Sequence, residues 1–225
     1  MTPPCERYVP GYGSANADFH VIGTHPGTHG GVETGIPFTG KPWSRDFFTA
    51  LERGGLVDEI TWGKTDADTA DGSIHPSDAN GRSADTRGIV DLVAHRTFFS
   101  YLHMCLPGDD GPDETDYTAM EAYFDAELRA IAAHVLLPVG RRATEHLLSR
   151  YTAVPNSDPV DMDERHGTEI RGSGWLIVPI KSPAEWEDGD ADRLVEGLET
   201  LQSTDFRREA DLGRFLAGGD PYFVR

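Results

Sequence analysis

Two glycine-flanked turns in the first forty residues have the composition best suited to binding chemistry. An apolar stretch at 17–23 leads into a Gly- and Pro-containing turn at 24–27, and a second turn at 35–40 holds Phe38 beside a proline. Glycine lets backbone N–H groups approach a ligand closely. A strand, a bare turn and then a helix place a ligand at the carboxyl edge of a parallel sheet. We therefore expect Phe38 to be presented to a ligand, with a core aromatic as the alternative.

Two further patterns in this region are set aside on chemical grounds. His25 and His29 are four residues apart, but they lie in a glycine-rich turn and lack a third ligand, which disfavours a metal site. Residues 35–41 spell G-x-x-x-x-G-K. However, Pro42 replaces the Ser or Thr that binds magnesium, and Pro37 removes an N–H from the phosphate cradle. We therefore reject nucleotide hydrolysis.

The elements that must position these turns alternate between strands and helices. Apolar runs and helical periodicity predict strands at about 19–23, 98–106, 135–140 and 175–180, and helices at about 44–54, 115–133, 142–151 and 190–203. This alternation predicts an α/β fold, a three-layer α/β/α sandwich with a central, mainly parallel four-stranded sheet. The expected strand ends are Gly23, Cys105, Gly140 and Ile180. They would meet at one edge, where such folds keep their chemistry.

A single domain is expected for residues 1–225, because no Ser-, Gly- or Pro-rich linker divides the chain. Residues 59–87 are rich in Asp, Thr, Gly and Ala, which predicts an exposed acidic loop or lobe. The tail at 206–225 is expected to dock on the domain, because it carries large apolar groups. These groups are Phe215, Leu216, Tyr222 and Phe223.

The charge of the chain indicates an unusual solution environment. The net charge is −18, with 38 acidic and 20 basic residues, and the lysines are Lys41, Lys64 and Lys181. An acidic, lysine-poor surface suggests a halophilic protein. Acidity opposes nonspecific DNA binding, which rests on basic charge. Molar salt, however, shortens the Debye length to about 3 Å, so a nucleic-acid partner is not excluded.

The cysteines and the hydropathy pattern bear on the cellular compartment. Cys5 and Cys105 could form a disulfide, but we expect reduced thiols in a cytosol. No apolar run approaches membrane length, and the N-terminus lacks the apolar core of a signal peptide. The expectation is a cytoplasmic protein with no membrane partner, present as a monomer.

The order of these motifs resembles the uracil-DNA glycosylase superfamily, most closely its family-4 iron–sulfur-type branch. That branch carries Gly-Glu-Ala-Pro-Gly and then Gly-x-Pro-Phe-Val-Gly. Here residues 23–27 read Gly-Thr-His-Pro-Gly and residues 35–40 read Gly-Ile-Pro-Phe-Thr-Gly. Residues 100–107 sit where the family has Thr-Asn-Val-Val-Lys-Cys-Arg-Pro, and residues 180–183 sit where it has its final His-Pro-Ser. The resemblance extends from about Val9 to Leu201.

The resemblance implies an enzyme of base-excision DNA repair that hydrolyses the N-glycosidic bond of uracil or another deaminated base. Its partner would be DNA containing a damaged or deaminated base, which the family flips out of the helix. The chemistry needs donors aimed at the developing charge and a group that holds water. The alternative is a catalytically inactive member that binds a base, a nucleotide or nucleic acid. A hydrolase of another type lacks support, because no nucleophile elbow or Cys/His pair is present.

For substrate binding, the resemblance implies Pro26, Gly27, Phe38, Gly40 and Tyr101. Phe38 matches the ring on which the flipped base stacks. Tyr101 stands where an Asn would read the uracil edge. The remaining three match the backbone turns of the two motifs.

For catalysis, the candidate positions are Thr24, His25, Glu33, Lys181 and Ser182. Thr24 stands where the family has its water-handling Glu. Ser182, or Lys181 with a shifted alignment, stands where the leaving-group His belongs. We hypothesise that His25 donates to the base or holds a water, that Glu33 supplies the missing carboxylate, and that Lys181 stabilises an anion.

The resemblance also bears on cofactors. Cys5 and Cys105 correspond to two of the branch's four cluster cysteines, and Tyr123 lies near the place of a third. Two thiolates cannot hold a four-iron cluster, so we expect no cofactor and no metal. His75-Pro76-Ser77 spells the last motif at the wrong place in the chain, which we attribute to chance. Trp186 follows the last motif and could wedge into DNA, although a solvated helix lead-in is the simpler interpretation.

Overall fold

The computed structural model describes residues 3–62, 89–106, 108, 111–153 and 159–213. Its centre is a six-stranded sheet with the order β1-β5-β2-β6-β8-β7. The strands are β1 Tyr12–Gly13, β2 Phe19–Gly23, β5 Thr97–Tyr101, β6 Val135–Pro138, β7 Ile170–Arg171 and β8 Leu176–Ile177. Strands β5, β2, β6 and β8 are parallel, and β1 and β7 pair antiparallel at the two edges. The predicted mainly parallel four-stranded sheet is therefore confirmed, with two short edge strands added.

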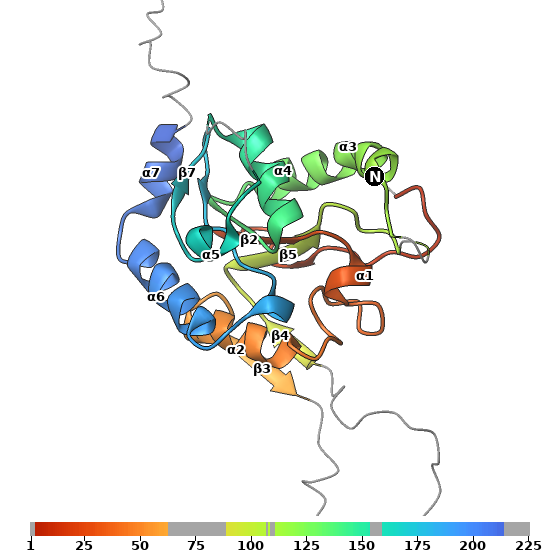
Figure 1. Cartoon of the computed structure of the whole chain (residues 1–225), viewed down its shortest axis with the longest axis horizontal. Coiled ribbons are helices and arrows are strands. Elements are labelled where there is room, and N and C mark those ends of the chain that lie inside the picture. The colour runs from red at the N-terminus through yellow and green to blue at the C-terminus, as the bar shows by residue number, and fades with distance from the viewer. Residues whose placement is uncertain (1–2, 63–88, 107, 109–110, 154–158, 214–225) are drawn as a thin grey trace, which may run out of the picture.

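Helices cover both faces of this sheet. They are α1 Pro26–His29, α2 Ser44–Arg53, α3 Glu114–Ile131, α4 Arg141–Tyr151, α5 Met162–Arg165, α6 Asp190–Gln202, α7 Phe206–Gly213 and the 3-10 turn η1 Pro183–Glu185. Figure 1 shows α3 and α4 on one side of the sheet and α2 and α6 on the other, which is the predicted three-layer arrangement. Among the described helices, none has the length and apolar composition needed to cross a membrane.

Two apolar clusters hold the layers together, and the strand period explains them. Every residue of β2 and of β6 is buried. Consecutive side chains of a strand point to opposite faces of the sheet. Val21 and Leu137 accordingly belong to the cluster that includes α2 and α6. Ile22 and Leu136 belong to the cluster that includes α3 and α4.

A two-stranded sheet lies beside α2, where a loop was expected. Strand β3 Glu59–Trp62 pairs antiparallel with β4 Ile89–Val93. At residues 59–62 a strand therefore replaces the expected loop, the alternative of an exposed lobe stays a prediction, and β4 was not predicted. Ile60 and Trp62 alternate with exposed residues and pack, half-buried, against the α2 and α6 cluster. Residues 63–88, which include the His-Pro-Ser stretch and most of the expected loop, lie outside the described residues.

The N-terminal segment is tied covalently to the segment that follows β5. Cys5 and Cys105 form a disulfide with their Cα atoms 6.0 Å apart, so the expectation of reduced thiols is wrong for this structure. Tyr8 also pairs with Cys105 in an antiparallel bridge. The sequence could not reveal this pairing, because the two cysteines are 100 residues apart and meet only when the chain folds back along β5.

Helix α7 docks at the start of β2. The Phe206 ring lies 5.3 Å from the Phe19 ring, and Arg207 donates hydrogen bonds of 2.7 and 2.6 Å to the two Asp18 oxygens. Burial alone would raise the pKa of Asp18, but the hydrogen bonds from Arg207 and Arg96 outweigh it and the pKa is lowered. The large apolar groups expected to dock, from Phe215 onward, lie outside the described residues.

Candidate functional site

The carboxyl ends of the parallel strands meet at one edge of the sheet, and the glycine-rich turns begin there. Strand β5 ends at Tyr101, earlier than expected. The pairing of β5 with β2 continues beyond it, because the His103 N–H donates a 3.0 Å hydrogen bond to the Thr24 carbonyl. Val139 and Ile180 form a parallel bridge that extends β6 and β8 in the same way. The predicted meeting of strand ends is therefore present.

The first turn contains a short helix that was not expected. Pro26 occupies the first position of α1, where its missing N–H costs nothing. The His29 N–H donates to the His25 carbonyl at 3.0 Å, and the Gly30 N–H donates to the Pro26 carbonyl at 2.7 Å. The expectation that His25 and His29 lie in a non-helical turn is therefore wrong. They occupy the two ends of one helical turn.

His29 is the most enclosed polar side chain of this turn, with 1% of its surface exposed. Its Nδ1 accepts a 3.0 Å hydrogen bond from the Thr24 N–H. The ring stacks parallel to Tyr101, with centroids 6.3 Å apart, and lies 5.4 Å from the Phe38 ring. Burial, with smaller effects of His25 and Lys41, lowers the pKa of His29 to about 3. The imidazole is therefore neutral, and the bond at Nδ1 assigns its proton to Nε2.

Phe38 is fully buried, so the expectation of a presented ring is wrong and the core alternative holds. Its backbone has φ of +68°, a region that non-glycine residues rarely adopt. Two hydrogen bonds hold it there: the Phe38 N–H donates to the Tyr101 hydroxyl at 2.8 Å, and Ser44 Oγ donates to the Phe38 carbonyl at 2.7 Å. This backbone turns the ring inward against His29 and Phe47. Such strained residues cluster at functional sites.

The Tyr101 hydroxyl joins the two glycine turns. It accepts from the Phe38 N–H and donates a 3.0 Å hydrogen bond to the Gly30 carbonyl. The side chain is fully buried, and burial raises its pKa. Tyr101 therefore positions the turns, while a role in reading a base edge stays a prediction.

The structure separates the two positions proposed for the leaving-group donor. Lys181 Nζ lies 2.7 Å from Asp163 Oδ1 and 3.2 Å from Asp190 Oδ2. These contacts, led by the hydrogen bond to Asp163, raise the pKa of Lys181. The ammonium is thus held by α5 and α6. Ser182 instead lies beside the start of α4, where a methyl group on Gly140 would be 4.0 Å from its Cβ.

A buried histidine that sequence reasoning missed positions this last segment. His166 is fully buried, its Nδ1 accepts a 2.9 Å hydrogen bond from the Lys181 N–H, and its Nε2 donates to the Asp190 carbonyl at 2.8 Å. Trp186 packs 5.8 Å from this ring and donates its indole N–H to the Lys181 carbonyl at 2.9 Å. No sequence motif indicated His166, because its hydrogen-bond partners lie 15 and 24 residues further along the chain.

His25 lies at the more open end of α1 and is half-buried. Its Nε2 shares a 2.9 Å hydrogen bond with the Thr28 hydroxyl, whereas Nδ1 is buried without a partner among the described residues. Burial lowers the pKa of His25 to about 4, and the nearby charges of His103 and Lys41 contribute smaller effects in the same direction. His25 is therefore neutral near pH 7, and it could accept a hydrogen bond at Nδ1 or exchange partners at Nε2.

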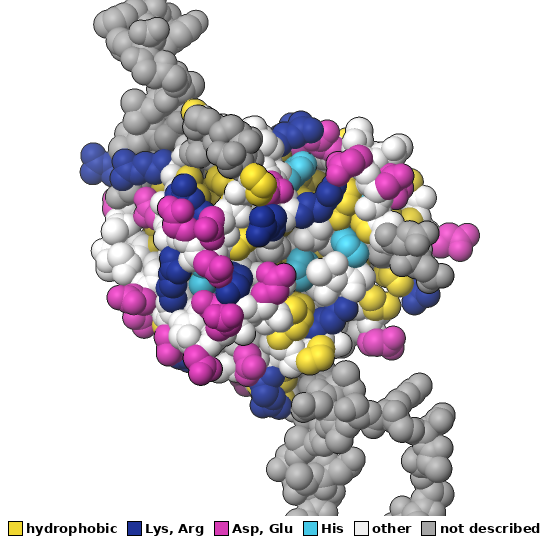
Figure 2. All heavy atoms as spheres, in the orientation of Figure 1, with side chains coloured by type: hydrophobic (Ala, Val, Ile, Leu, Met, Phe, Trp, Pro, Cys, Tyr) yellow, Lys and Arg dark blue, Asp and Glu magenta, His cyan; other side chains and the backbone are white. Residues whose placement is uncertain are grey.

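Lys41 and the predicted residues Glu33 and Gly40 border the turns from the solvent side. Lys41 Nζ donates a 2.7 Å hydrogen bond to the Gly27 carbonyl, which ties the second turn to the first. Glu33 and Gly40 are exposed on the loop between α1 and α2. Figure 2 shows histidine side chains at the surface of the viewed face, among basic and acidic side chains. Glu33 is thus available to solvent, and its role as a carboxylate near a substrate stays a prediction.

The residues compared with cluster cysteines do not fit an iron–sulfur cluster. Cys5 and Cys105 are bonded to each other. Met120 of α3, rather than Tyr123, lies against Cys105, with its Sδ 3.9 Å from the Cys105 Sγ. A four-iron cluster needs thiolate ligands, which a disulfide and a thioether do not provide. Across the described ranges, no group of three or more His, Cys, Asp or Glu residues is arranged to hold a metal ion.

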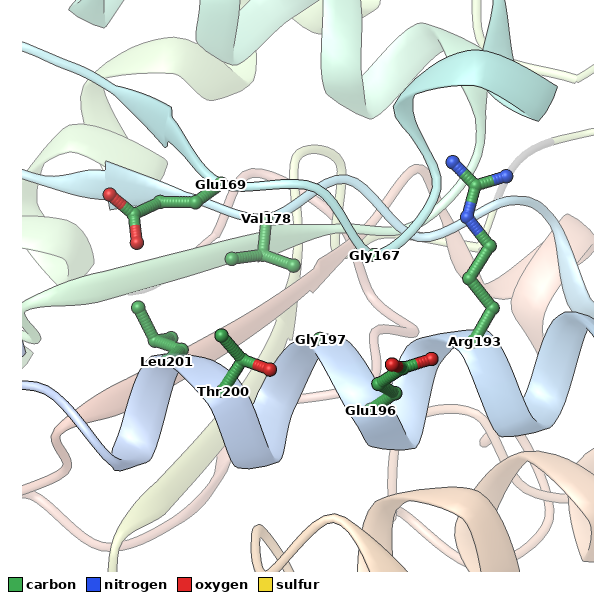
Figure 3. A pocket seen from close by; sticks show the side chains of 8 residues that line it. All are labelled: Gly167, Glu169, Val178, Arg193, Glu196, Gly197, Thr200 and Leu201. Atoms are coloured by element: carbon green, nitrogen blue, oxygen red, sulfur yellow. The ribbon is translucent and has the colours of Figure 1, made fainter.

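Two hollows among the described residues lie away from the strand-end turns. One, of about 260 Å³, lies between α6 and the segment leading to β7. Figure 3 shows its lining side chains, with Val178 and Leu201 on either side of the gap. The second, of about 680 Å³, is lined by residues of the β1 and β4 segments, among them Gly11, Tyr12, Ser14, Leu92 and His95.

The fold is that of an α/β protein in which two glycine-rich turns follow the carboxyl edge of a mainly parallel sheet. The family model of the Uracil DNA glycosylase superfamily matches residues 10–195, and the chain belongs to this superfamily. The predicted resemblance is therefore confirmed at the level of the superfamily.

Similar curated proteins carry a consistent name. The chain is 27% identical over 129 residues to the type-5 uracil-DNA glycosylase of Mycobacterium bovis, a match that covers 57% of this chain and 40% of that protein. It is 26% identical over 166 residues to the type-5 uracil-DNA glycosylase of Thermus thermophilus, covering 73% of this chain and 63% of that protein. The chain thus matches less than two thirds of the length of either relative. These relatives carry the type-5 name, whereas the expected nearest branch was family 4.

Proposed function

We propose that this protein is a DNA glycosylase of base-excision repair, which hydrolyses the N-glycosidic bond of uracil or another deaminated base in DNA. The observation that carries the proposal is the strand-end arrangement, in which Tyr101 joins the two superfamily turns around a buried, neutral His29. Fixed donors in a desolvated place are what a departing base needs, because they stabilise charge without reorganising. Superfamily membership and the names of the relatives support the same function.

In this proposal the predicted residues divide into three groups. The backbones of Pro26, Gly27 and Gly40 shape the site for the nucleobase. The ring of Phe38 forms the buried floor of that site. Thr24, His25, Glu33 and Ser182 are candidates for holding water or the base. Lys181 acts as an anchor for the last segment, since two carboxylates already hold its ammonium.

We further propose that the protein acts as a halophilic, cytoplasmic monomer on DNA in concentrated salt. The support is its net charge of −18. In dilute buffer this charge would repel the phosphate backbone of DNA. In molar salt the repulsion is screened beyond about 3 Å, so short-range contacts at the strand-end site can decide binding.

A base-release assay in molar KCl tests the function. Single- and double-stranded oligonucleotides carrying uracil, hypoxanthine or xanthine are incubated with excess protein, and abasic sites are revealed by alkali. We expect alkali-dependent breaks at one or more of these bases and none in the undamaged strand. Tight binding with no breaks would overturn the proposal and identify an inactive binding protein instead.

Phe38→Ala is a poor control for this assay. Its ring is fully buried, and removing a buried Phe costs about 3–5 kcal/mol of stability. Loss of activity in that variant would therefore report unfolding as readily as loss of base stacking. Variants that preserve buried volume give a cleaner answer.

A further inference from the structure

A space with room for at least a methyl group lies beside Gly140, where α1, α4 and the segment before η1 converge. Gly140 precedes α4 and has φ of +82°, a conformation that favours glycine. A methyl group placed on it would lie 4.0 Å from His29 Nε2 and 4.0 Å from Ser182 Cβ. The space is therefore bordered by a ring nitrogen of one element and a serine of another, with the start of a helix between them.

The ring of His29 is held so that Nε2, and not Nδ1, faces this space. Nδ1 is occupied by the Thr24 N–H at 3.0 Å. Tyr101 stacks on the ring at 6.3 Å and Trp43 meets its edge at 6.1 Å, which fixes its orientation. A neutral imidazole that accepts at one nitrogen donates at the other. The space beside Gly140 therefore receives an N–H donor in a fixed direction.

We propose that the His29 Nε2–H donates a hydrogen bond to a carbonyl oxygen of the departing pyrimidine, which makes His29 a catalytic residue. The inference rests on the proposed function. When the bond from C1′ to the base nitrogen breaks, its electron pair stays on the base and spreads to the carbonyl oxygens. Water adds to C1′ and releases a proton to solvent, and the base takes up a proton from solvent after leaving. His29 keeps its own proton throughout.

The other candidates are less well placed for this role. Lys181 is held by Asp163 and Asp190. His25 shares its Nε2 with Thr28, so it must first break that hydrogen bond to donate there. Ser182 borders the same space as His29 and can add a second, weaker donor.

Two volume-preserving variants separate catalysis from positioning. In His29→Asn the side-chain oxygen takes the place of Nδ1 as an acceptor, but no donor stands at the place of Nε2. In His29→Gln the side-chain amide can place a donor near Nε2, but the Thr24 N–H loses its acceptor. In single-turnover uracil release, corrected for the folded fraction by circular dichroism, we expect His29→Asn to lose about 10²–10³-fold in rate. We expect the rate of His29→Gln to stay within about tenfold of the wild-type rate. This loss is smaller than the loss expected for a deleted donor, because Gln keeps a donor near the place of Nε2. Affinity for an uncleavable oligonucleotide should change little in both.

The matched control is His20→Asn. His20 is also a fully buried histidine of this region, but it faces α3 through Phe124 and bonds Ser100. It should lose stability without losing rate per folded molecule. The reverse ranking, with His29→Asn active and His29→Gln inactive, would show that His29 only positions Thr24 and would overturn the inference. A wild type that releases no uracil would instead overturn the proposed function.

A measurement on the wild type keeps the inference testable if both variants unfold. The His29 Nε2–H resonance in a ¹⁵N-histidine spectrum should shift when free uracil is added at concentrations that inhibit release. An unshifted resonance under inhibition would overturn the inference, because the bound base would then not touch this donor.

Discussion

At the residue scale, the site depends on side chains whose surroundings differ from what their neighbours in sequence indicate. Phe38 sits between turn residues, yet its ring is fully buried. The reason is a hydrogen bond from its N–H to the hydroxyl of Tyr101, 63 residues away. The sequence could predict the two turns, because glycine and proline mark them locally. It could not predict the burial of Phe38 or the orientation of His29, because distant partners determine them.

Glu127 of α3 gives a residue-scale prediction about pH. Burial, offset in part by a hydrogen bond from Ser100, raises its pKa from 4.5 to about 7, and its Oε1 is buried without a hydrogen-bond partner among the described residues. The neighbouring His20, 3.9 Å away, is neutral because burial lowers its pKa to about 3. Between pH 4.5 and 7 the folded state keeps the Glu127 proton while the unfolded state loses it. Stability from this group therefore falls as pH rises through that window.

Glu127→Gln should remove that loss. At about 1.4 kcal/mol for each pKa unit, the variant should gain up to about 3 kcal/mol over the wild type at pH 8 and nothing at pH 4. Urea unfolding at both pH values measures the difference. An equal effect of the substitution at pH 4 and pH 8 would contradict the assignment.

At the element scale, the strands that formed as predicted are those buried on both faces. Every residue of β2 and β6 is buried, because helices cover both sides of these strands, and β6 is an entirely apolar run. The elements that sequence reasoning missed are short. β3 has four residues with a weak alternating pattern, and α1 is a single helical turn that begins at a proline. Such elements form because tertiary contacts support them, and their local signal is small.

The segment after β8 yields the element-scale prediction. His166 bridges the Lys181 N–H and the Asp190 carbonyl, and it is fully buried. His166→Leu would leave both backbone groups without partners, which costs about 1–3 kcal/mol for each group. We expect the free energy of unfolding to fall by about 2–6 kcal/mol. The exposed His95 serves as the control, and His95→Leu should change stability by less than about 0.5 kcal/mol.

That comparison is measured by urea unfolding of the two variants at pH 7. Equal, small losses in both would show that His166 does not hold the last segment. Since Ser182 lies in the same segment, a large loss in His166→Leu would also explain how the fold keeps Ser182 beside Gly140.

At the scale of the whole molecule, the Cys5–Cys105 disulfide joins the N-terminal segment to the end of the sheet that bears the site. It closes a loop of 100 residues. Chain entropy predicts about 4.7 kcal/mol of stabilisation for a loop of that length. Dithiothreitol should therefore lower the free energy of unfolding of the wild type by roughly that amount, as measured by urea unfolding with and without reductant.

The doubly substituted Cys5→Ser, Cys105→Ser protein is the control for that experiment. It should unfold like the reduced wild type and should not respond to dithiothreitol. A wild type whose unfolding is unchanged by reductant would contradict the disulfide.

The claim that the strand-end turns release a base from DNA is tested most directly by counting the free base. Wild-type protein and the His29→Asn variant are mixed in excess with an oligonucleotide that carries isotope-labelled uracil in molar KCl, and free uracil is measured by mass spectrometry. The account predicts about one uracil per oligonucleotide for the wild type and release slowed about 10²–10³-fold for the variant. Intact oligonucleotide and no free uracil with the wild-type protein would contradict it.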